Sequence, residues 1–277
     1  MPNLRVVYQN VTDTATITAS STSGSYSVNN LKTEYKSQFH RSTTTSVEYT
    51  LTWASNQTIQ CVVLPCTNLS STATLQVRLY NATTALTNEL ISGADSGTVL
   101  ANQFTGISEF SNPNGNLFAY GAVTKTVHWF STPYTTVRAL KITLTDTNNP
   151  VGYIDCARII CGSFWEPTYN ASKDNLVLST TDTSETSRND AGDLISEPGF
   201  IYDSVQLNLD VLTDTDRDTL LKIIKKLGVS QNFLLSLFPE NRTSNELQYL
   251  IYGKRSNSSI NYILPGFSSH SIEITGW

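Results

Sequence analysis

Polar and apolar residues alternate along much of the first half of the chain. In segment 73–80, for example, Leu75 and Val77 would face one way and Gln76 the other. One apolar and one polar face per strand is typical of an antiparallel sheet in a sandwich. We therefore expect an antiparallel β-sandwich (jelly roll) that ends near Trp165. The segments that predict its strands are 47–53, 58–64, 73–80, 126–130, 137–144 and 153–161.

The pattern breaks after this point. Residues 166–199 are mostly polar, and 179–193 predict a mobile loop or an arm that becomes ordered on assembly. We place a domain boundary here, with a sandwich at 1–168 and a small α+β domain with one helix at 169–277. The fold class expected for the whole chain is mainly β. Further strands are predicted at 200–212, 247–253 and 271–274.

One segment, 214–227, predicts a helix. Leu220, Ile223 and Leu227 recur at helical spacing, Thr213 is a suitable N-cap, and Gly228 follows the last apolar residue. Aspartates at the start and lysines at the end complement the helix dipole.

Composition excludes several function classes. The formal net charge is −5 and the pI about 5.2, without the clustered Lys and Arg that a nucleic-acid partner requires. The three lysines Lys222, Lys225 and Lys226 lie within the predicted helix. The sequence shows neither an apolar stretch of about 18 residues nor a signal-peptide pattern, so we expect no membrane span and synthesis in the cytoplasm.

Four cysteines form two C-x4-C pairs, Cys61/Cys66 and Cys156/Cys161. A metal site or disulfide is one interpretation, although thiolate sites usually contain a C-x2-C turn. Residues five apart on a regular strand face opposite sides, so the two members of a pair would not converge. Buried packing is the alternative, because free cysteine is among the most buried residue types.

Catalytic motifs are absent from the sequence. His40, His128 and His270 have no metal-ligand spacing, and there is no nucleophile elbow or phosphate-binding loop. The aspartates at 214–218 resemble the start of a calcium loop, but Thr219 and Lys225 stand where Gly and Glu would be needed. We expect no catalytic residue, no metal and no cofactor.

Aromatic residues offer a candidate ligand-binding surface. Tyr120, Trp129 and Tyr134 lie close together in the sequence, after the loop at 112–116. Aromatic rings can stack on the apolar faces of sugars, and loops collect at one end of a sandwich. The alternative is that Trp129 or its neighbour Phe130 belongs to the core.

Three segments together resemble a known fold family. Val28-Asn29-Asn30-Leu31-Lys32 and Phe39-His40-Arg41-Ser42, followed by the strand at 47–53, resemble the opening of discoidin-like (galactose-binding-like) jelly rolls. Residues 137–144 and 152–162 resemble its closing strands. In versions from tailed-phage virion proteins, the last strand ends in Gly, then an aromatic residue and a Pro. Gly162, Phe164, Trp165 and Pro167 match that pattern.

The second domain resembles the tail-tube and distal-tail proteins of bacteriophages, with a long polar loop between strands, one short helix and more strands. This resemblance implies a non-enzymatic structural subunit of the virion tail (tail tip, baseplate or collar). Its partners would be copies of itself in a ring and other phage tail proteins. A surface poor in charge suits such homo-oligomeric packing.

Two alternatives remain. The first is a carbohydrate-binding module whose sandwich loops contact a host surface glycan. The second is a polysaccharide hydrolase, which needs two carboxylates about 5–9 Å apart across a cleft. Glu109, Asp146 and Asp155 are candidates for such a pair, but the sequence does not pair them.

Overall fold

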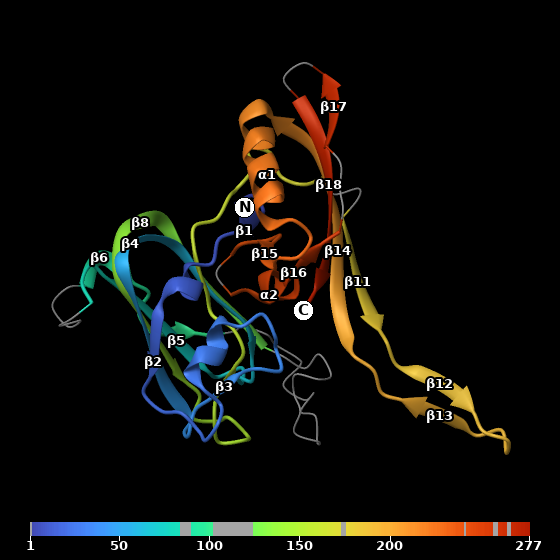
Figure 1. Ribbon diagram of the computed structural model, residues 1–277, viewed down its shortest axis with the longest axis horizontal. Coiled ribbons are helices and arrows are strands. Elements are labelled where there is room, and N and C mark those ends of the chain that lie inside the picture. Colours follow the sequence, from blue (N-terminus) through green and yellow to red (C-terminus); the bar gives the residue numbers. More distant parts are fainter. Residues whose placement is uncertain are drawn as a thin grey trace. The chain divides into compact units, whose positions relative to one another are not determined.

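The computed structural model describes residues 2–83, 90–101, 124–172, 176–240, 242–256, 260–264 and 267–277. The described chain is mainly β, with antiparallel strands and two α-helices (Figure 1). It divides into two compact units. Unit 1 holds the described residues up to Pro167 together with 233–250, and unit 2 holds those of 168–232 and 251–277. Segment 233–250, which the sequence placed in the second domain, thus packs in the first unit.

Unit 1 is built on one antiparallel sheet, in which nine strands are described. Its centre is a pair of 22-residue strands, β4 (Ser46–Thr67) and β8 (Thr124–Thr145). The strands run in the order β3-β9-β4-β8-β5-β6, and β2, β7 and β10 pair with β4 or β5. The other strands are β2 (Thr16–Ala19), β3 (His40–Arg41), β5 (Thr74–Tyr80), β6 (Leu90–Asp95), β7 (Val99–Leu100), β9 (Asp155–Cys156) and β10 (Ile160–Gly162). Two 3-10 turns, η1 (Val11–Thr14) and η2 (Val28–Lys32), precede β3.

The long strands correct the predicted boundaries. Segments 47–53 and 58–64 form one strand, as do 126–130 and 137–144. The polar residues between them resemble a turn in sequence, but their backbone stays extended and their side chains are largely exposed. Register shifts between Thr52 and Cys61 interrupt the regular pairing of β4 with β8 along this stretch. Conversely, the single strand expected at 153–161 is two short ones, β9 and β10.

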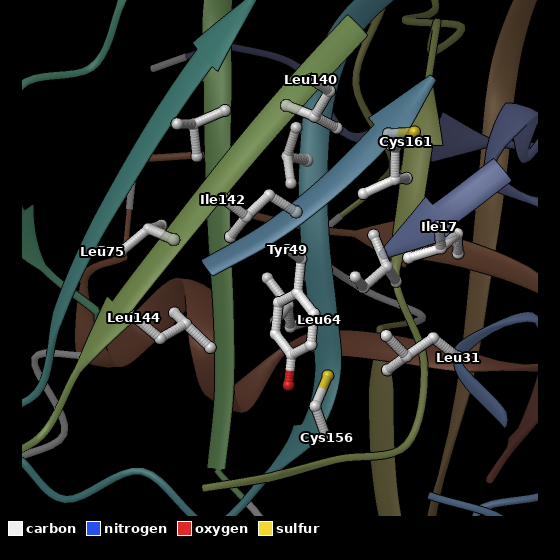
Figure 2. Packing of buried hydrophobic residues seen from close by; sticks show 14 of the residues in the cluster. Ile17, Leu31, Tyr49, Leu64, Leu75, Leu140, Ile142, Leu144, Cys156 and Cys161 are labelled. Atoms are coloured by element: carbon white, nitrogen blue, oxygen red, sulfur yellow. The ribbon is translucent and has the colours of Figure 1, made fainter. Parts of the chain in front are cut away.

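The core of unit 1 lies between the two halves of this sheet. Tyr49 and Leu51 from the first half of β4 belong to the same buried cluster as Val62 and Leu64 from its second half. The sheet therefore closes over itself as a sandwich. Figure 2 shows the side chains of Leu140, Ile142 and Leu144 on β8 in this cluster, together with neighbours from β2, β5, η2, β9 and β10. The expected antiparallel β-sandwich is confirmed.

The second half of β4 is buried on both faces. Cys61 and Val63 are fully buried, although they point away from the core cluster. Segment 233–250 helps to bury this outer face, because Arg242 donates to the carbonyl of Val127, the partner of Val63 on β8. The segment forms β15 (Phe233–Ser236), which pairs with β1 (Arg5–Val7), and helix α2 (Ser244–Gln248). This packing explains why 233–250 belongs to unit 1.

Unit 2 is an antiparallel sheet with one long helix, α1 (Asp214–Leu227). Strand β14 (Ile201–Thr213) pairs with β11 (Val177–Asp182) and with β18 (Phe267–Gly276), which also pairs with β16 (Leu250–Arg255) and β17 (Ile260–Leu264). Helix α1 has the predicted bounds, with Thr213 as N-cap and Gly228 in a left-handed conformation at its end. The strand predicted at 247–253 was wrong at its start. Residues 244–248 form helix α2, which Thr243 caps, and strand β16 begins at Leu250.

Segment 179–193 was expected to be a mobile loop or an arm that becomes ordered on assembly; it has strand structure at 179–182, in β11, and at 185–188. Beyond β11 the chain continues into a hairpin of β12 (Glu185–Arg188) and β13 (Leu194–Glu197), then returns as β14. We call residues 182–200 the arm. Every residue of β12 and β13 is exposed, and the two strands form a separate hairpin that extends beyond the sheet containing β11 and β14 (Figure 1). The arm thus has regular structure without a core of its own.

Candidate functional site

The three predicted ligand residues do not share one environment in the structure. Tyr120 lies outside the described residues. Trp129 is 4% exposed, on the outer face of the sheet opposite Cys61. Tyr134 is half-buried; its hydroxyl donates to the carbonyl of Gly93 at 2.7 Å, and its ring packs edge-on against Phe130. Trp129 and Tyr134 therefore do not form a common exposed stacking surface.

Trp129 is buried by residues that are distant in sequence. Phe164 packs edge-on against its ring at 5.3 Å between centroids, and the Arg5 guanidinium lies 5.0 Å from the ring centroid. Its indole N–H donates to Oε1 of Glu246 on α2. Because the Trp129 ring is almost completely buried, it has no face on which a sugar could stack. Its hydrogen bond to Glu246 instead joins segment 233–250 to the sheet.

Glu246 lies at the centre of a buried polar network. Its Oε1 also accepts from Ser236 Oγ at 3.2 Å, and its Oε2 accepts from the backbone N–H of Arg242 at 2.7 Å. Burial raises the pKa of Glu246, and these hydrogen bonds oppose the shift. Arg242 Nη1 lies 3.0 Å from His128 Nδ1. Burial, and then the Arg242 charge, lower the pKa of His128 to about 4. The hydrogen bonds of Glu246 and the contact of His128 with Arg242 tie segment 233–250 to β8, which is a structural role.

The remaining histidines also have structural partners. His40 is fully buried between Thr22 Oγ1, 3.1 Å from Nε2, and Tyr49 OH, 3.0 Å from Nδ1. Burial lowers the pKa of His40. His270 is buried on β18, opposite Leu209. All three histidines are strand residues, in β3, β8 and β18.

The carboxylates considered for hydrolysis do not form a described catalytic pair. Glu109 lies outside the described residues. Asp146 is fully buried and accepts from the backbone N–H and the hydroxyl of Ser70, which fixes a loop. Asp155 is paired with Arg41. The described residues contain no cluster of three or more metal-ligating side chains and no helix long and apolar enough to span a membrane.

All four cysteines are free and buried, so the packing interpretation is confirmed. Cys156 and Cys161 belong to the core cluster, as Figure 2 shows, whereas Cys61 and Cys66 do not. Burial raises the pKa of each thiol, that of Cys161 to about 12. Such thiols are poor nucleophiles at neutral pH.

The arrangement best suited to a ligand is a group that we call the Arg41 cluster: Tyr26, Phe39, Arg41, Tyr153 and Asp155. Strands β3 and β9 pair so that Arg41 lies directly opposite Asp155, which puts both side chains on one face. Arg41 Nε and Nη2 donate to the two carboxylate oxygens of Asp155, both at 2.8 Å. The hydrogen bond with Asp155 raises the pKa of Arg41, whose charge is retained.

Three half-buried rings surround this ion pair. The Arg41 guanidinium carbon lies 3.9 Å from the ring centroid of Tyr153, 4.6 Å from that of Tyr26 and 5.4 Å from that of Phe39. Tyr26 and Phe39 stack on each other at 4.9 Å with an interplanar angle of 22°. The loop that carries Tyr26 is held by a hydrogen bond from Ser23 N to the Arg41 carbonyl. The rings therefore have fixed positions before any ligand arrives.

The cluster remains open to solvent. The Arg41 side chain is 21% exposed, and among the described residues its Nη1 donates no hydrogen bond. This nitrogen offers two N–H donors beside partly exposed aromatic rings. The carboxylate of Asp155 balances the arginine charge, so the site as a whole is close to neutral. Donors beside rings bind polar ligands with apolar faces, but supply neither a nucleophile nor an acid–base pair.

Sequence reasoning missed this cluster, because its members come from three separate loops and short strands. The signal that could have identified it was the local density of aromatic and charged residues in Phe39-His40-Arg41 and in Tyr153-Ile154-Asp155. Both segments carry the resemblance to the jelly-roll fold, whereas the ligand residues predicted from sequence lie at 120–134.

No protein-family profile and no curated protein sequence match the chain. Solved structures with partial likeness include chitosan-binding module 1 from a chitosanase/glucanase of Paenibacillus sp. IK-5, at 16% identity and a TM-score of 0.40, covering 56% of this chain and 99% of the module. A Streptococcus pneumoniae fucose-binding module has 10% identity and a TM-score of 0.35, with 56% of this chain and 94% of the module covered. A fucolectin from striped bass (Morone saxatilis) serum has 9% identity and a TM-score of 0.38, with coverages of 74% and 69%. At scores this low, the likeness assigns neither family nor function.

Proposed function

We propose that the chain is a non-enzymatic carbohydrate-binding protein and that unit 1 binds a neutral glycan at the Arg41 cluster. The observation that carries the proposal is the open Nη1 of Arg41 beside the half-buried rings of Tyr26, Phe39 and Tyr153. Rings pack on the C–H faces of a pyranose, and the guanidinium donates to its hydroxyls. Because Asp155 balances the charge of Arg41, the ligand class is a neutral sugar.

Two substitutions separate this site from the one expected from sequence. Tyr153→Leu removes the ring closest to Arg41, and Tyr134→Leu removes a half-buried tyrosine of the earlier candidate site. A glycan array identifies a ligand, and calorimetric titration then compares the variants. We expect Tyr153→Leu to bind at least about tenfold more weakly, which corresponds to about 1.4 kcal/mol. Tyr134→Leu should bind like the unmodified protein.

Either of two results would reject the proposal. One is the absence of binding to every neutral glycan on the array. The other is a loss of affinity in Tyr134→Leu while Tyr153→Leu, folded by circular dichroism, retains full affinity. The second result would return the site to the region of Trp129 and Tyr134.

A second candidate function is a structural subunit of a bacteriophage tail, located in the virion. The observation that favours an assembly role is the arm, a regular hairpin in which every strand residue is exposed. The structures named above are sugar-binding proteins and lend no support to a tail role. Mass spectrometry of purified phage particles tests it: the protein should be present in stoichiometric amounts, and its absence from the particles would reject a virion role.

A further inference from the structure

The arm of unit 2 has the features of a surface that binds a partner. A two-stranded hairpin is at most marginally stable in water without a further strand or a packing surface. Strands β12 and β13 pair with each other, and all their residues are exposed. Leu194 is 62% exposed, Ile195 48% and Phe200 60%. The arm thus presents large apolar side chains on a structure that a partner would stabilise.

The net charge of the arm indicates the charge that its partner should carry. Residues 182–200 contain five acidic residues and one arginine, a net charge of −4. Glu185 lies directly opposite Glu197 in the hairpin. Like charges in this position destabilise a strand pair, unless a cation lies between them. No ion pair to either glutamate occurs among the described residues. Ile195 shares their face of the hairpin.

A complementary surface exists on the same chain, at the C-terminal end of α1. Lys222, Lys225 and Lys226 are exposed there, and no acidic residue occurs between Asp218 and Glu240. Val229, just beyond the helix, is 50% exposed. This surface therefore combines several positive charges with one apolar side chain. The face of the arm combines two negative charges with one apolar side chain.

We infer that the arm of one copy binds the C-terminal end of α1 of a second copy. Glu185 and Glu197 contact the lysines, and Ile195 packs near Val229. The two surfaces are different, so each copy can provide one and accept the other, and the contact can repeat until the assembly closes. This contact is independent of glycan binding by unit 1, and either proposal can fail without the other.

The experiment is a charge exchange followed by light-scattering mass at micromolar concentration. The unmodified protein should exceed the 30.5 kDa of one chain. Glu185→Lys with Glu197→Lys should reduce the mass to that of one chain, as should Lys222→Glu with Lys225→Glu. Combining all four substitutions should restore the larger mass. Asp210→Lys, a charge reversal at an exposed position outside the arm, should leave the mass unchanged.

A deletion keeps the test decisive if a charge variant fails to fold. Replacing 184–199 by Gly-Gly joins Thr183 to Phe200, whose backbones already hydrogen-bond at 3.0 Å. The deletion variant should be monomeric with a normal circular dichroism spectrum. A monomeric unmodified protein, or a deletion variant that keeps the larger mass, would overturn the inference. Folded charge variants that keep the mass, or a folded fourfold variant that stays monomeric, would do the same.

Discussion

His128 makes a quantitative prediction about stability in acid. Arg242 Nη1 lies 3.0 Å from His128 Nδ1, and a guanidinium can only donate, so Nδ1 must accept. The neutral ring therefore carries its proton on Nε2. A second proton on Nδ1 would break this hydrogen bond and place a positive charge against Arg242. This geometry agrees with a pKa lowered to about 4, chiefly by burial.

The direction in which pH changes the free energy of unfolding depends on whether the folded or the unfolded chain binds the proton. Below the ordinary pKa of 6.5, the unfolded chain takes up a proton at His128 that the folded chain does not. The free energy of unfolding must therefore fall as the pH drops from 6.5 towards 4, and this loss levels off below 4. A difference of about 2.5 pKa units corresponds to at most about 3 kcal/mol. Glu246, whose pKa is raised, contributes the opposite slope.

The variant His128→Asn isolates this contribution. Its amide oxygen takes the position of Nδ1 and can accept from Arg242, but it does not titrate in this range. Urea unfolding, followed by tryptophan fluorescence between pH 7 and pH 4, gives the free energy of unfolding for both proteins. The difference between them should change by up to about 3 kcal/mol in favour of the variant as the pH falls. Parallel curves over the whole range would refute the assigned hydrogen bond and its electrostatic consequence.

Three further predictions concern the backbone and the buried thiols. Gly253→Ala places a Cβ against the Thr275 carbonyl and should destabilise the protein by about 3 kcal/mol; an unchanged melting temperature would contradict the close packing of β16 on β18. Thr213→Ala removes the side chain that accepts from Asp216 N and should cost about 1 kcal/mol in urea unfolding, whereas Thr215→Ala, two residues further along the chain, should cost less. The four cysteines should react with a thiol reagent only after denaturation, because all are buried, and rapid labelling of the native protein would contradict their placement.

The elements that were predicted accurately from sequence are those determined by residues close together in the chain. Helix α1 was predicted with its observed bounds because Thr213, the apolar stripe and Gly228 all act within one segment. The strand boundaries within β4 and β8 were less accurate, since exposed polar residues such as Ser55 and Asn56 look like a turn when the pairing partner is unknown.

The site depends on contacts that sequence does not reveal. The sequence left Trp129 either a ligand-binding ring or a buried one, and the structure buries it, because Phe164 and Glu246 cover it from segments distant in the chain. The Arg41 cluster forms because β3 pairs with β9, about 114 residues away in sequence. Neither strand is long enough to show a period, so their pairing could not be predicted from the pattern.

The central claim is that unit 1 binds a neutral glycan at the Arg41 cluster. Hydrogen–deuterium exchange, with and without a neutral oligosaccharide identified on the array, tests it most directly. The account predicts slower exchange in peptides covering 22–41 and 150–156, and unchanged exchange in 124–136 and in unit 2. Protection confined to 124–136, or no protection at a saturating sugar concentration, would contradict it.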